Sequence, residues 1–341
     1  MSKTVRVACY GTGNFARKKH LITLKALPDV ELVAFCDSNP ETLAAAGKEF
    51  DVSALYTSHY DMLEKEKFDA LFSIVPAYAR TDCEILAARK GIHLFIEKPQ
   101  AAKIEKAKEI DQAIRESGVL STVGYRERFR PSLQAAREFM QEKLFLHVVF
   151  TTFYFIRQAP RWSNLFDQMG GPLMDWGGHF MDQVRYVTGA DVTTVQAFLV
   201  DSPRKTARLD VPISYCASFR FNNGAVASYN CMASFQENAI PPAVSNLRQF
   251  LLGYDGGVLE IHNDLIKANG EVIYQSEATD PWVLSVEAFI EAVRTGDRSL
   301  IRNDFSDGLL SLGPILAAKH SGQHGGELVE MRKFMGPEPG A

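Results

Sequence analysis

The sequence predicts a two-domain α/β protein, in which a doubly wound parallel sheet is followed by an α+β domain with a large, mostly antiparallel sheet. Three observations predict this fold. The 341 residues are too many for one ordinary hydrophobic core. Short strand-like and helix-like segments alternate through the first 124 residues, which is typical of parallel strands joined by crossovers. After Gly124 the strand-like runs lengthen and follow one another through tight turns, which is typical of antiparallel sheets.

The first domain is expected to span residues 1–124. Apolar runs predict its strands at 5–9, 30–36, 54–56, 69–75, 92–96 and 119–123. The segments between them predict helices at 14–27, 41–50, 60–66, 79–90 and 103–117. The run 93–96 shows no polar alternation, so we expect a central strand that is covered on both faces.

The second domain is expected to span residues 125–335, and the tail 336–341, rich in Gly and Pro, should be flexible. The expected helices lie at 127–141, 281–296 and 305–321, and the expected strands at 144–155, 193–200, 214–221, 225–233 and 247–252. The Asn-Asn-Gly turn at 222–224 and the Asp-Gly-Gly turn at 255–257 are hairpin signals. A broad sheet of this kind often packs against a copy of itself, so we expect a homo-oligomer, either a dimer or a tetramer.

The composition excludes several classes of partner. A formal net charge of −4 without any basic block argues against nucleic acid or an anionic membrane as the partner. The sequence contains no run of about eighteen apolar residues, which is the length that a membrane-spanning helix needs. The first strand begins too early to leave room for a signal peptide. Five scattered cysteines without a C-x-x-C pair are typical of small buried hydrophobic residues. We therefore expect a soluble, cytoplasmic protein with reduced thiols.

The first strand runs directly into Gly11-Thr12-Gly13-Asn14-Phe15-Ala16, which matches the dinucleotide-binding pattern G-x-G-x-x-A. The first glycine permits a tight turn, the second lets a pyrophosphate approach the backbone, and the small third residue lets helix and strand pack closely. Asp37 ends the second strand, where an acid can bind the ribose hydroxyls and repel a 2′-phosphate. The motif predicts NAD as the cofactor, with NADP possible because Arg17, Lys18 and Lys19 lie close in sequence.

A second motif, Glu97-Lys98-Pro99, follows the strand at 92–96. Ligands of open parallel sheets bind outside the carboxyl ends of the strands, so a lysine at this position is a candidate for chemistry. By itself the position does not decide the role, because a lysine at a strand end is more often a solvated charge.

A third segment, 169–182, contains Asp175 and His179 four residues apart, one turn from each other on an expected helix. A carboxylate one turn from an imidazole can orient it and stabilise its charged form. The alternative is that Asp175 caps the helix and His179 is an ordinary interior residue. The residue types leave both readings open, although the surrounding glycines allow a ligand to come close.

We predict no metal site. His320 and His324 share the i,i+4 spacing of metal ligands, but Gly322, Gly325 and Gly326 around them favour a helix end. Retention of activity after chelation would check this expectation.

Taken together and in this order, the glycine loop, Asp37, Glu97-Lys98-Pro99 and Gly170-Gly171…Asp175…His179 resemble the Gfo/Idh/MocA oxidoreductase family, which includes inositol and sugar dehydrogenases. The resemblance covers roughly residues 4 to 330. It implies a Rossmann domain followed by an open sheet that covers the nicotinamide. It also implies that Pro76 and Glu97 belong to the cofactor site, together with the loop, Asp37 and Lys98.

The resemblance further implies that Lys98, Asp175 and His179 line the substrate pocket, with His179 as proton acceptor and Lys98 holding the reacting hydroxyl. These roles are chemically sensible, because an imidazole titrates near neutrality and an ammonium stabilises a developing alkoxide. The Lys98 amine should have a lowered pKa where it is partly desolvated beside the cationic nicotinamide. Arg126 and Trp162 complete the expected substrate-binding set.

The sequence departs from the usual family pattern at Arg80, where a histidine is common, and at Arg126, where a neutral amide is frequent. With Arg161 they suggest a pocket that selects an anionic sugar derivative, and the alternative is that they are ordinary surface arginines. The leading hypothesis is an NAD(P)-dependent oxidoreductase acting on a secondary hydroxyl or ketone of a sugar, polyol or sugar derivative. The alternatives are a non-catalytic NAD(P)-binding regulator, and a glycosidase that works by transient oxidation with tightly held NAD.

Overall fold

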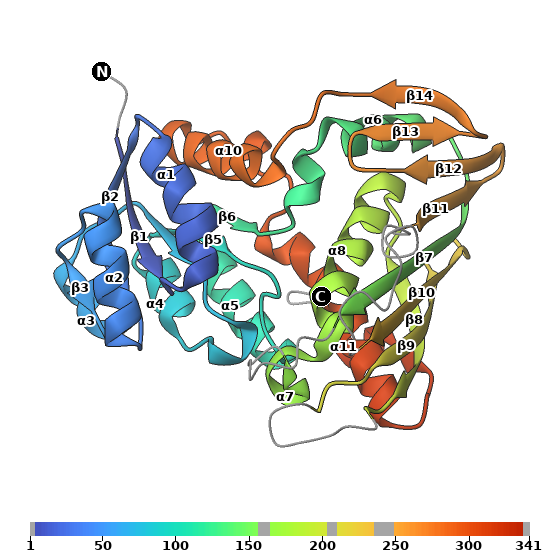
Figure 1. The fold of residues 1–341 in the computed structure, drawn as a ribbon, viewed down its shortest axis with the longest axis horizontal. Coiled ribbons are helices and arrows are strands. Elements are labelled where there is room, and N and C mark those ends of the chain that lie inside the picture. Colours follow the sequence, from blue (N-terminus) through green and yellow to red (C-terminus); the bar gives the residue numbers. More distant parts are fainter. Residues whose placement is uncertain (1–3, 156–163, 203–209, 235–248, 337–341) are drawn as a thin grey trace. The chain divides into compact units, whose positions relative to one another are not determined.

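The computed structural model describes residues 4–155, 164–202, 210–234 and 249–336 (Figure 1). The chain forms two compact units, and the division differs from a single boundary after residue 124. The first unit comprises residues 1–101, 105–129 and 280–308, and the second comprises 102–104, 130–279 and 309–341. The expected tail lies largely outside the described residues.

The first unit contains a parallel six-stranded sheet in the order β3-β2-β1-β4-β5-β6, which confirms the doubly wound Rossmann fold. Its strands are β1 (Val5–Tyr10), β2 (Val30–Cys36), β3 (Leu55–Tyr56), β4 (Ala70–Ser73), β5 (His93–Ile96) and β6 (Ser121–Val123). Its helices are η1 (Ala16–Leu21), α1 (Ile22–Ala26), α2 (Pro40–Phe50), α3 (His59–Lys65), η2 (Ala77–Ala79), α4 (Cys83–Arg89), α5 (Ile104–Ser117), η3 (Arg126–Phe129), α10 (Pro281–Thr295) and η5 (Arg298–Leu300).

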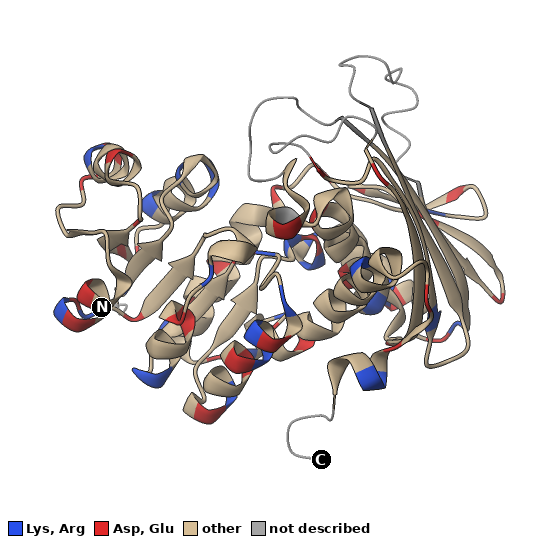
Figure 2. Ribbon diagram, turned by 90° about the horizontal axis from the view of Figure 1, so that it is seen from below, with Lys and Arg blue, Asp and Glu red and all other residues tan. Residues whose placement is uncertain are grey.

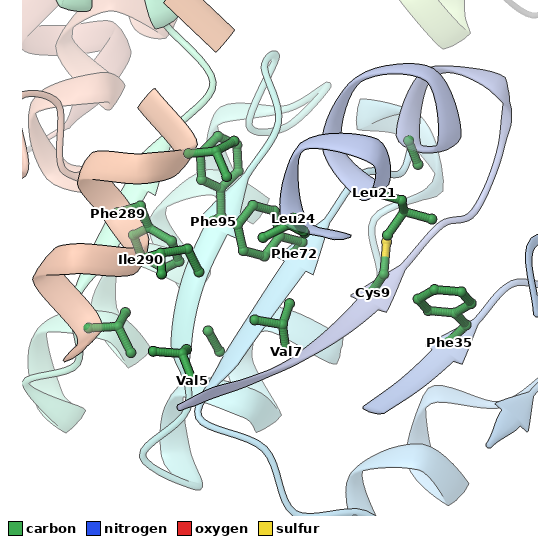
Figure 3. Close-up of a cluster of buried hydrophobic side chains, with 14 of the residues drawn as sticks. Val5, Val7, Cys9, Leu21, Leu24, Phe35, Phe72, Phe95, Phe289 and Ile290 are labelled. Carbon is green, nitrogen blue, oxygen red and sulfur yellow. The ribbon is translucent and has the colours of Figure 1, made fainter. Parts of the chain in front are cut away.

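Strands β4, β5 and β6 carry no Lys, Arg, Asp or Glu, whereas the helices around the sheet carry many (Figure 2). The core of this unit includes Phe72 and Phe95, whose rings stack with centroids 4.7 Å apart (Figure 3). Phe289 of α10 meets both rings edge-on at 5.6 Å. This aromatic packing explains why α10 belongs to the first unit although it comes late in the sequence.

Two expected helices of the early chain have different limits. The helix expected at 79–90 begins at Cys83, after the short 3₁₀ turn η2. The helix expected at 127–141 is interrupted at Arg130, which is extended before Pro131, the first residue of α6 (Pro131–Met140). A residue before proline is disfavoured in the helical region, and proline is favoured at the first helical position.

The second unit contains a nine-stranded sheet in the order β14-β13-β12-β11-β7-β10-β9-β8-β15. Among the described residues of this sheet only the pair β7–β10 is parallel, so the prediction of a mostly antiparallel sheet is confirmed. Its strands are β7 (Phe145–Phe155), β8 (Val192–Val200), β9 (Ser214–Phe221), β10 (Val226–Ser234), β11 (Gln249–Tyr254), β12 (Gly257–Ile261), β13 (Leu265–Ala268), β14 (Glu271–Gln275) and β15 (Val329–Glu330). Helices α6, α7 (Phe166–Met169), α8 (Gly171–Thr188), α11 (Phe305–Gln323) and α12 (Met331–Met335) accompany the sheet.

Helix α8 packs on β7 and β10, and alternate residues of the strands point toward the covered face. Strands β12 to β14 lie beyond the last strand that the sequence predicts, and the turn at Asp255-Gly256 joins β11 to β12 as a hairpin. Within the described residues, no helix combines the length and hydropathy that a membrane span requires.

Candidate active site

The glycine loop lies between β1 and the first helical turn of the chain. Gly11 has φ +91°, and a Cβ there would meet the carbonyl oxygen of Ile74 at 2.8 Å, so this position requires glycine. A Cβ on Gly13 would meet nothing within 4 Å, and this open space is what a pyrophosphate approaching the backbone needs. The helix that begins at Asn14 directs its N-terminal N–H groups toward the same place. The loop therefore fits a dinucleotide.

Asp37 is tied to this loop. Its Oδ2 accepts hydrogen bonds from the backbone N–H of Thr12 at 2.7 Å and from the Thr12 hydroxyl at 3.2 Å. Its Oδ1 accepts from the backbone N–H of Asn39 at 2.9 Å. These contacts hold the carboxylate in one orientation at the end of β2, where a ribose acceptor is expected.

Aromatic and cationic side chains gather beside the loop in a way that the sequence did not indicate. The Phe15 ring, 43% exposed, meets Trp282 of α10 with centroids 6.1 Å apart. The guanidinium of Arg126 lies 3.6 Å from the Trp282 ring centroid, and the Lys19 ammonium lies 4.4 Å from it. Arg126 also forms an ion pair with Glu127 at 3.2 Å. The half-buried Arg126 is thus neither fully solvated nor an ordinary surface arginine.

Lys98 is half-buried and follows β5, as expected, and its peptide bond to Pro99 is cis. The preceding residue, Glu97, is buried and accepts a hydrogen bond from Nε2 of buried His20 at 2.8 Å. A carboxylate only accepts, so Nε2 is the protonated nitrogen. The other carboxylate oxygen of Glu97 accepts from the backbone N–H of Lys98 at 3.0 Å. Glu97 therefore anchors the backbone that carries Lys98.

Burial alone would raise the pKa of the Glu97 carboxyl. The hydrogen bond and charge of His20, together with the cations Lys98 and Arg126, outweigh burial and hold this pKa below its ordinary value of 4.5. Gly124 approaches the same carboxylate so closely that a Cβ there would meet Oε2 at 2.6 Å. The anchor is consequently a tightly enclosed anion.

The structure corrects both interpretations of Arg80. This residue is neither an anion-selecting group of an open pocket nor an ordinary surface arginine. Its side chain is fully buried, and Nη1 donates to Glu84 Oε1 at 2.6 Å and to the Ser73 hydroxyl at 2.7 Å. Nη2 donates to the backbone oxygen of Glu97 at 2.5 Å. Arg80 thus links Glu84 of α4 to the ends of β4 and β5, at the peptide group that precedes Lys98.

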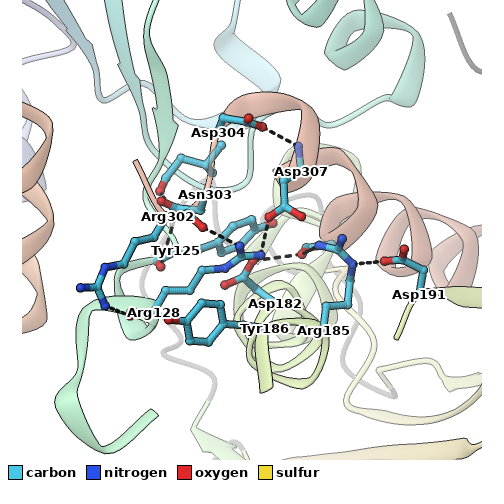
Figure 4. A network of polar contacts seen from close by, with 12 residues as sticks. Tyr125, Arg128, Asp182, Arg185, Tyr186, Asp191, Arg302, Asn303, Asp304 and Asp307 are labelled. Carbon is cyan, nitrogen blue, oxygen red and sulfur yellow. Dashed lines mark hydrogen bonds and ion pairs between the residues drawn. The ribbon is translucent and has the colours of Figure 1, made fainter. Parts of the chain in front are cut away.

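A further set of contacts fixes the segment after β6, within the same unit (Figure 4). The Asn303 amide donates to the backbone oxygens of Val123 at 2.6 Å and Tyr125 at 3.3 Å. Arg128 pairs with Asp307 at 2.6 Å and donates to the backbone oxygen of Arg302 at 2.7 Å. Segment 302–307 therefore holds the turn that carries Arg126.

In the second unit, Asp175 and His179 lie on α8, as the spacing predicted. His179 is 6% exposed, whereas Asp175 and Trp176 are half-buried. The rings of Trp176 and His179 have centroids 6.4 Å apart. Residues four apart on a helix share one face, so the carboxylate and the imidazole are one turn from each other.

The start of α8 is positioned by close packing. Gly170 and Gly171 both have positive φ, and a Cβ on Gly171 would meet the Tyr215 hydroxyl at 2.2 Å. Nearly two turns into the helix, a Cβ on Gly177 would meet Ile315 at 3.1 Å and Tyr229 at 3.3 Å. The glycines therefore bring the helix close to the sheet, which is a structural reason for their presence beside Asp175 and His179.

The other end of α8 is held by polar contacts within its own unit (Figure 4). Arg185 donates to Asp191 at 2.7 Å and to the Ser311 hydroxyl at 2.8 Å, and Ser311 donates in turn to Asp182 at 3.0 Å. The expected substrate residues Arg161 and Trp162 lie outside the described residues. Sequence reasoning missed His20 and Trp282, and the only signal for His20 was its place in the helix after the glycine loop.

Family models match most of the chain. Residues 5–125 match the model described as oxidoreductase family, NAD-binding Rossmann fold, and residues 133–257 match the GFO/IDH/MocA C-terminal domain.

Two curated relatives and one solved structure align along nearly the whole chain. The scyllo-inositol 2-dehydrogenase (NAD(+)) of Bacillus subtilis is 24% identical over 342 residues, which cover 95% of this chain and 96% of the relative. The D-glucoside 3-dehydrogenase of Escherichia coli is 28% identical over 314 residues, 86% of this chain and 89% of the relative. The crystal structure of an oxidoreductase from Thermotoga maritima, 22% identical, has a TM-score of 0.83 and covers 97% of this chain and 100% of its own, a likeness of fold.

Proposed function

The chain belongs to the Gfo/Idh/MocA family of NAD-binding oxidoreductases, and on that premise we propose that it interconverts a secondary hydroxyl and a ketone on a sugar, an inositol-like polyol or a sugar derivative. The observation that carries the proposal is the arrangement of the first unit. A glycine loop that fits a dinucleotide follows strand β1. Lys98, whose backbone is anchored by the buried Glu97–His20 pair, follows strand β5 of the same parallel sheet. The names of the two curated relatives support the class of substrate.

Lys98 and His179 serve one reaction in this proposal. In the oxidation direction His179 accepts the proton of the substrate hydroxyl, and the Lys98 ammonium stabilises the negative charge that develops on the oxygen. Asp175 orients the imidazole and stabilises its charged form. When bound, NAD supplies the acceptor for the hydride that leaves the carbon bearing this hydroxyl. Proton and hydride together account for the two electrons and two hydrogens that the alcohol loses.

Arg126 is the candidate within the described residues for selecting an anionic substrate, because the buried Arg80 side chain is bound to Glu84 and Ser73 inside the first unit. The Arg126 guanidinium is stacked on Trp282 and paired with Glu127, and a guanidinium can bind a carboxylate or phosphate through two N–H groups at once. We propose this role as secondary. If Arg126→Ala leaves the kinetics unchanged on acidic and neutral sugars alike, Arg126 does not select charge.

We also propose that the open face of the nine-stranded sheet forms a homo-oligomer. Strands β7 to β10 carry a single Lys, Arg, Asp or Glu residue, Arg220 (Figure 2). Their outward residues include Phe198 and Met232, both more than half exposed. Light scattering after gel filtration would measure the mass, and a monomer at micromolar concentration would contradict the proposal. All five cysteines are free thiols, which supports a reducing compartment such as the cytoplasm.

The decisive experiment is a panel of sugars, inositols and sugar acids with NAD, read at the absorbance of the reduced cofactor. Lys98→Ala and His179→Ala should each lower kcat by about 10²–10⁴-fold, which is the usual contribution of a positioned acid or base. NAD binding by His179→Ala should be unchanged. Lys106→Ala and His262→Ala, on partly exposed side chains, are the matched controls and should retain activity. If both site variants turn over normally, the assignment of the site is wrong.

The same assay separates the alternatives. Cofactor that survives gel filtration, with glycoside cleavage but no net reduction of NAD, would identify hydrolysis through transient oxidation. Cofactor binding without turnover of any substrate in the panel would favour a regulator.

A further inference from the structure

Two histidines and a glutamate converge where α11 ends, in the second unit. Nε2 of His320 lies 2.8 Å from Oε1 of Glu327, and the rings of His320 and His324 face each other with centroids 4.1 Å apart and an interplanar angle of 31°. One ligand atom from each of the three residues lies within 4.8 Å of the other two. The side chains of His320 and Glu327 are 40% and 51% exposed, so an ion can reach them from solvent.

The glycines that argued against a metal site in the sequence are what bring the third residue to the pair. Gly325 and Gly326 have φ of +70° and +82°, and they turn the chain back past the end of the helix. A Cβ on Gly326 would meet the Phe198 ring at 2.2 Å, so the turn lies tightly against β8. The helix end expected from these glycines is therefore present, and it places Glu327 beside His320.

The backbone of this turn is held independently of the three side chains. Buried Ser321 donates from its hydroxyl to the backbone oxygen of Glu327 at 2.6 Å and accepts from the backbone N–H of Ala197 at 2.9 Å. The Gln196 amide donates to the backbone oxygen of Gly326 at 2.7 Å. Strand β8 therefore fixes the backbone at Ser321 and at Gly326, which hold the helix end and the turn beside each other.

The tautomer of His324 also suits coordination. Nδ1 of His324 lies 2.8 Å from the backbone oxygen of His320, and because a carbonyl only accepts, Nδ1 carries the proton. The lone pair of His324 is then on Nε2, and a hydrogen bond from the second ring nitrogen is the usual outer contact of a metal-bound imidazole. The last carbonyls of α11 add the negative end of the helix dipole, which favours a cation.

We propose that His320, His324 and Glu327 bind one divalent transition-metal ion of the Zn²⁺ type. Two imidazoles and one carboxylate are a donor set that suits zinc, and water would complete the coordination. Bonds of about 2.0–2.1 Å in a tetrahedral site require donor atoms about 3.3 Å apart, which partly exposed side chains reach by rotation. The hydrogen bond to Glu327 puts a proton on Nε2 of His320, so coordination through Nε2 would break this bond and move the proton to Nδ1 of the same ring.

The site links the C-terminal end of α11 to the segment that enters β15, the strand at the edge of the nine-stranded sheet. The neighbouring helix α12 contributes the Phe334 ring, whose centroid is 5.8 Å from that of His320, and its Lys333 pairs with Glu330 of β15 at 3.0 Å. An ion at this position therefore acts as a structural clip on the sheet edge and takes no part in the proposed oxidation.

The test is titration of the untagged, chelator-treated full chain with Zn²⁺ by calorimetry, with Mg²⁺ as the ion that this nitrogen-containing set should not hold. We expect one Zn²⁺ per chain and a higher unfolding temperature with Zn²⁺. The variants His324→Gln and Glu327→Gln should each weaken the affinity at least about tenfold, since even outer contacts of metal sites are worth 10–100-fold. Both should melt at the wild-type temperature without the ion.

His262→Gln is the matched control, because His262 is partly exposed and lies 3.6 Å from Glu260, but this pair is not part of a described group with a second histidine. The Zn²⁺ affinity of this variant should equal that of the wild type. All titrations use the Cys216→Ser background, since Cys216 is an exposed thiol that would compete for Zn²⁺. If the chain binds no stoichiometric Zn²⁺, or if His324→Gln and Glu327→Gln bind as tightly as the control, the proposal is wrong. Either variant suffices if the other does not fold.

Discussion

Different forces position the two candidate parts of the site. One part is the backbone that carries Lys98, and the other is the start of helix α8, which carries Asp175 and His179. In the first unit, buried charges do the positioning, because Glu97 is held by His20 and by the Lys98 backbone, and Arg80 by Glu84. At the start of α8, the helix is positioned by the close packing of its glycines against tyrosines of the sheet. Buried ion pairs are sensitive to loss of one partner, whereas packed glycines are sensitive to added volume. The two regions should therefore respond to opposite kinds of substitution.

The largest effect on stability is expected from Arg80→Met. The change leaves the Glu84 carboxylate buried with only the Ser73 hydroxyl, and loss of one partner of a buried pair typically costs about 3–5 kcal/mol. Urea unfolding followed by circular dichroism measures the loss. Arg294→Met is the matched control, because its pair with Glu291 is partly exposed, with side chains 27% and 45% accessible, and such pairs contribute about 0–1 kcal/mol.

The double variant Arg80→Met/Glu84→Leu completes this experiment. Removing both charges should recover part of the stability, because the uncompensated carboxylate is gone. Equal stability losses for Arg80→Met and Arg294→Met would contradict the view that buried charge positions this region.

The second largest effect is expected from Gly171→Ala at the start of α8. The new methyl group would meet the Tyr215 hydroxyl, and the positive φ adds backbone strain, so the free energy of unfolding should fall by about 2–4 kcal/mol. Gly189→Ala, at the other end of the helix, is the control because it has φ +68° with nothing within 4 Å of its Cβ, and only the backbone cost of about 1 kcal/mol should remain.

Tyr215→Phe tests the cause of that difference. The nearest atoms to the new methyl group are then the ring carbon and the Val211 Cβ, both at 3.4 Å, so Gly171→Ala should cost less in this background. If Gly171→Ala and Gly189→Ala are equally destabilising in the wild-type background, close packing does not position α8.

A smaller effect is expected from Glu97→Gln. The amide puts an N–H group opposite either His20 Nε2 or the Lys98 backbone N–H, so one buried donor loses its acceptor at a cost of about 1–3 kcal/mol. Urea unfolding at neutral pH measures this loss. Glu109→Gln, in an exposed pair with Lys106, is the control and should be nearly neutral.

The pH dependence of this difference has a definite sign. The pKa of Glu97 is lowered in the folded chain, so the stabilisation is fully present above its ordinary value of 4.5 and is lost as pH falls through the lower folded pKa. The stability gap between the wild type and Glu97→Gln should therefore narrow below pH 4.5. A gap that widens on acidification would show that Glu97 is not held as an anion.

The comparison also explains how much the sequence could predict. The alternation of elements, the glycine loop, Asp37 and the helix that carries Asp175 and His179 depend on local pattern, and the structure has them near the expected positions. The partners of Arg80 and His20 come from other elements, and no local pattern specifies such pairings. The return of α10 to the first sheet escaped prediction for the same reason, since it depends on aromatic contacts with Phe72 and Phe95.

The smallest effect is expected at Asp37, where the structure joins an anion to the glycine loop. In Asp37→Asn the amide oxygen can still accept from Thr12, but the charge that repels a 2′-phosphate is gone. The ratio of NADP to NAD affinity should therefore rise about tenfold, which corresponds to about 1.4 kcal/mol of electrostatic discrimination. Titration of both cofactors against the quenching of tryptophan fluorescence measures the ratio. Asp51→Asn, an exposed residue at the end of α2, is the control. Equal weakening of both cofactors would mean that Asp37 only braces the loop, and tighter NADP binding by the wild type would overturn the preference for NAD.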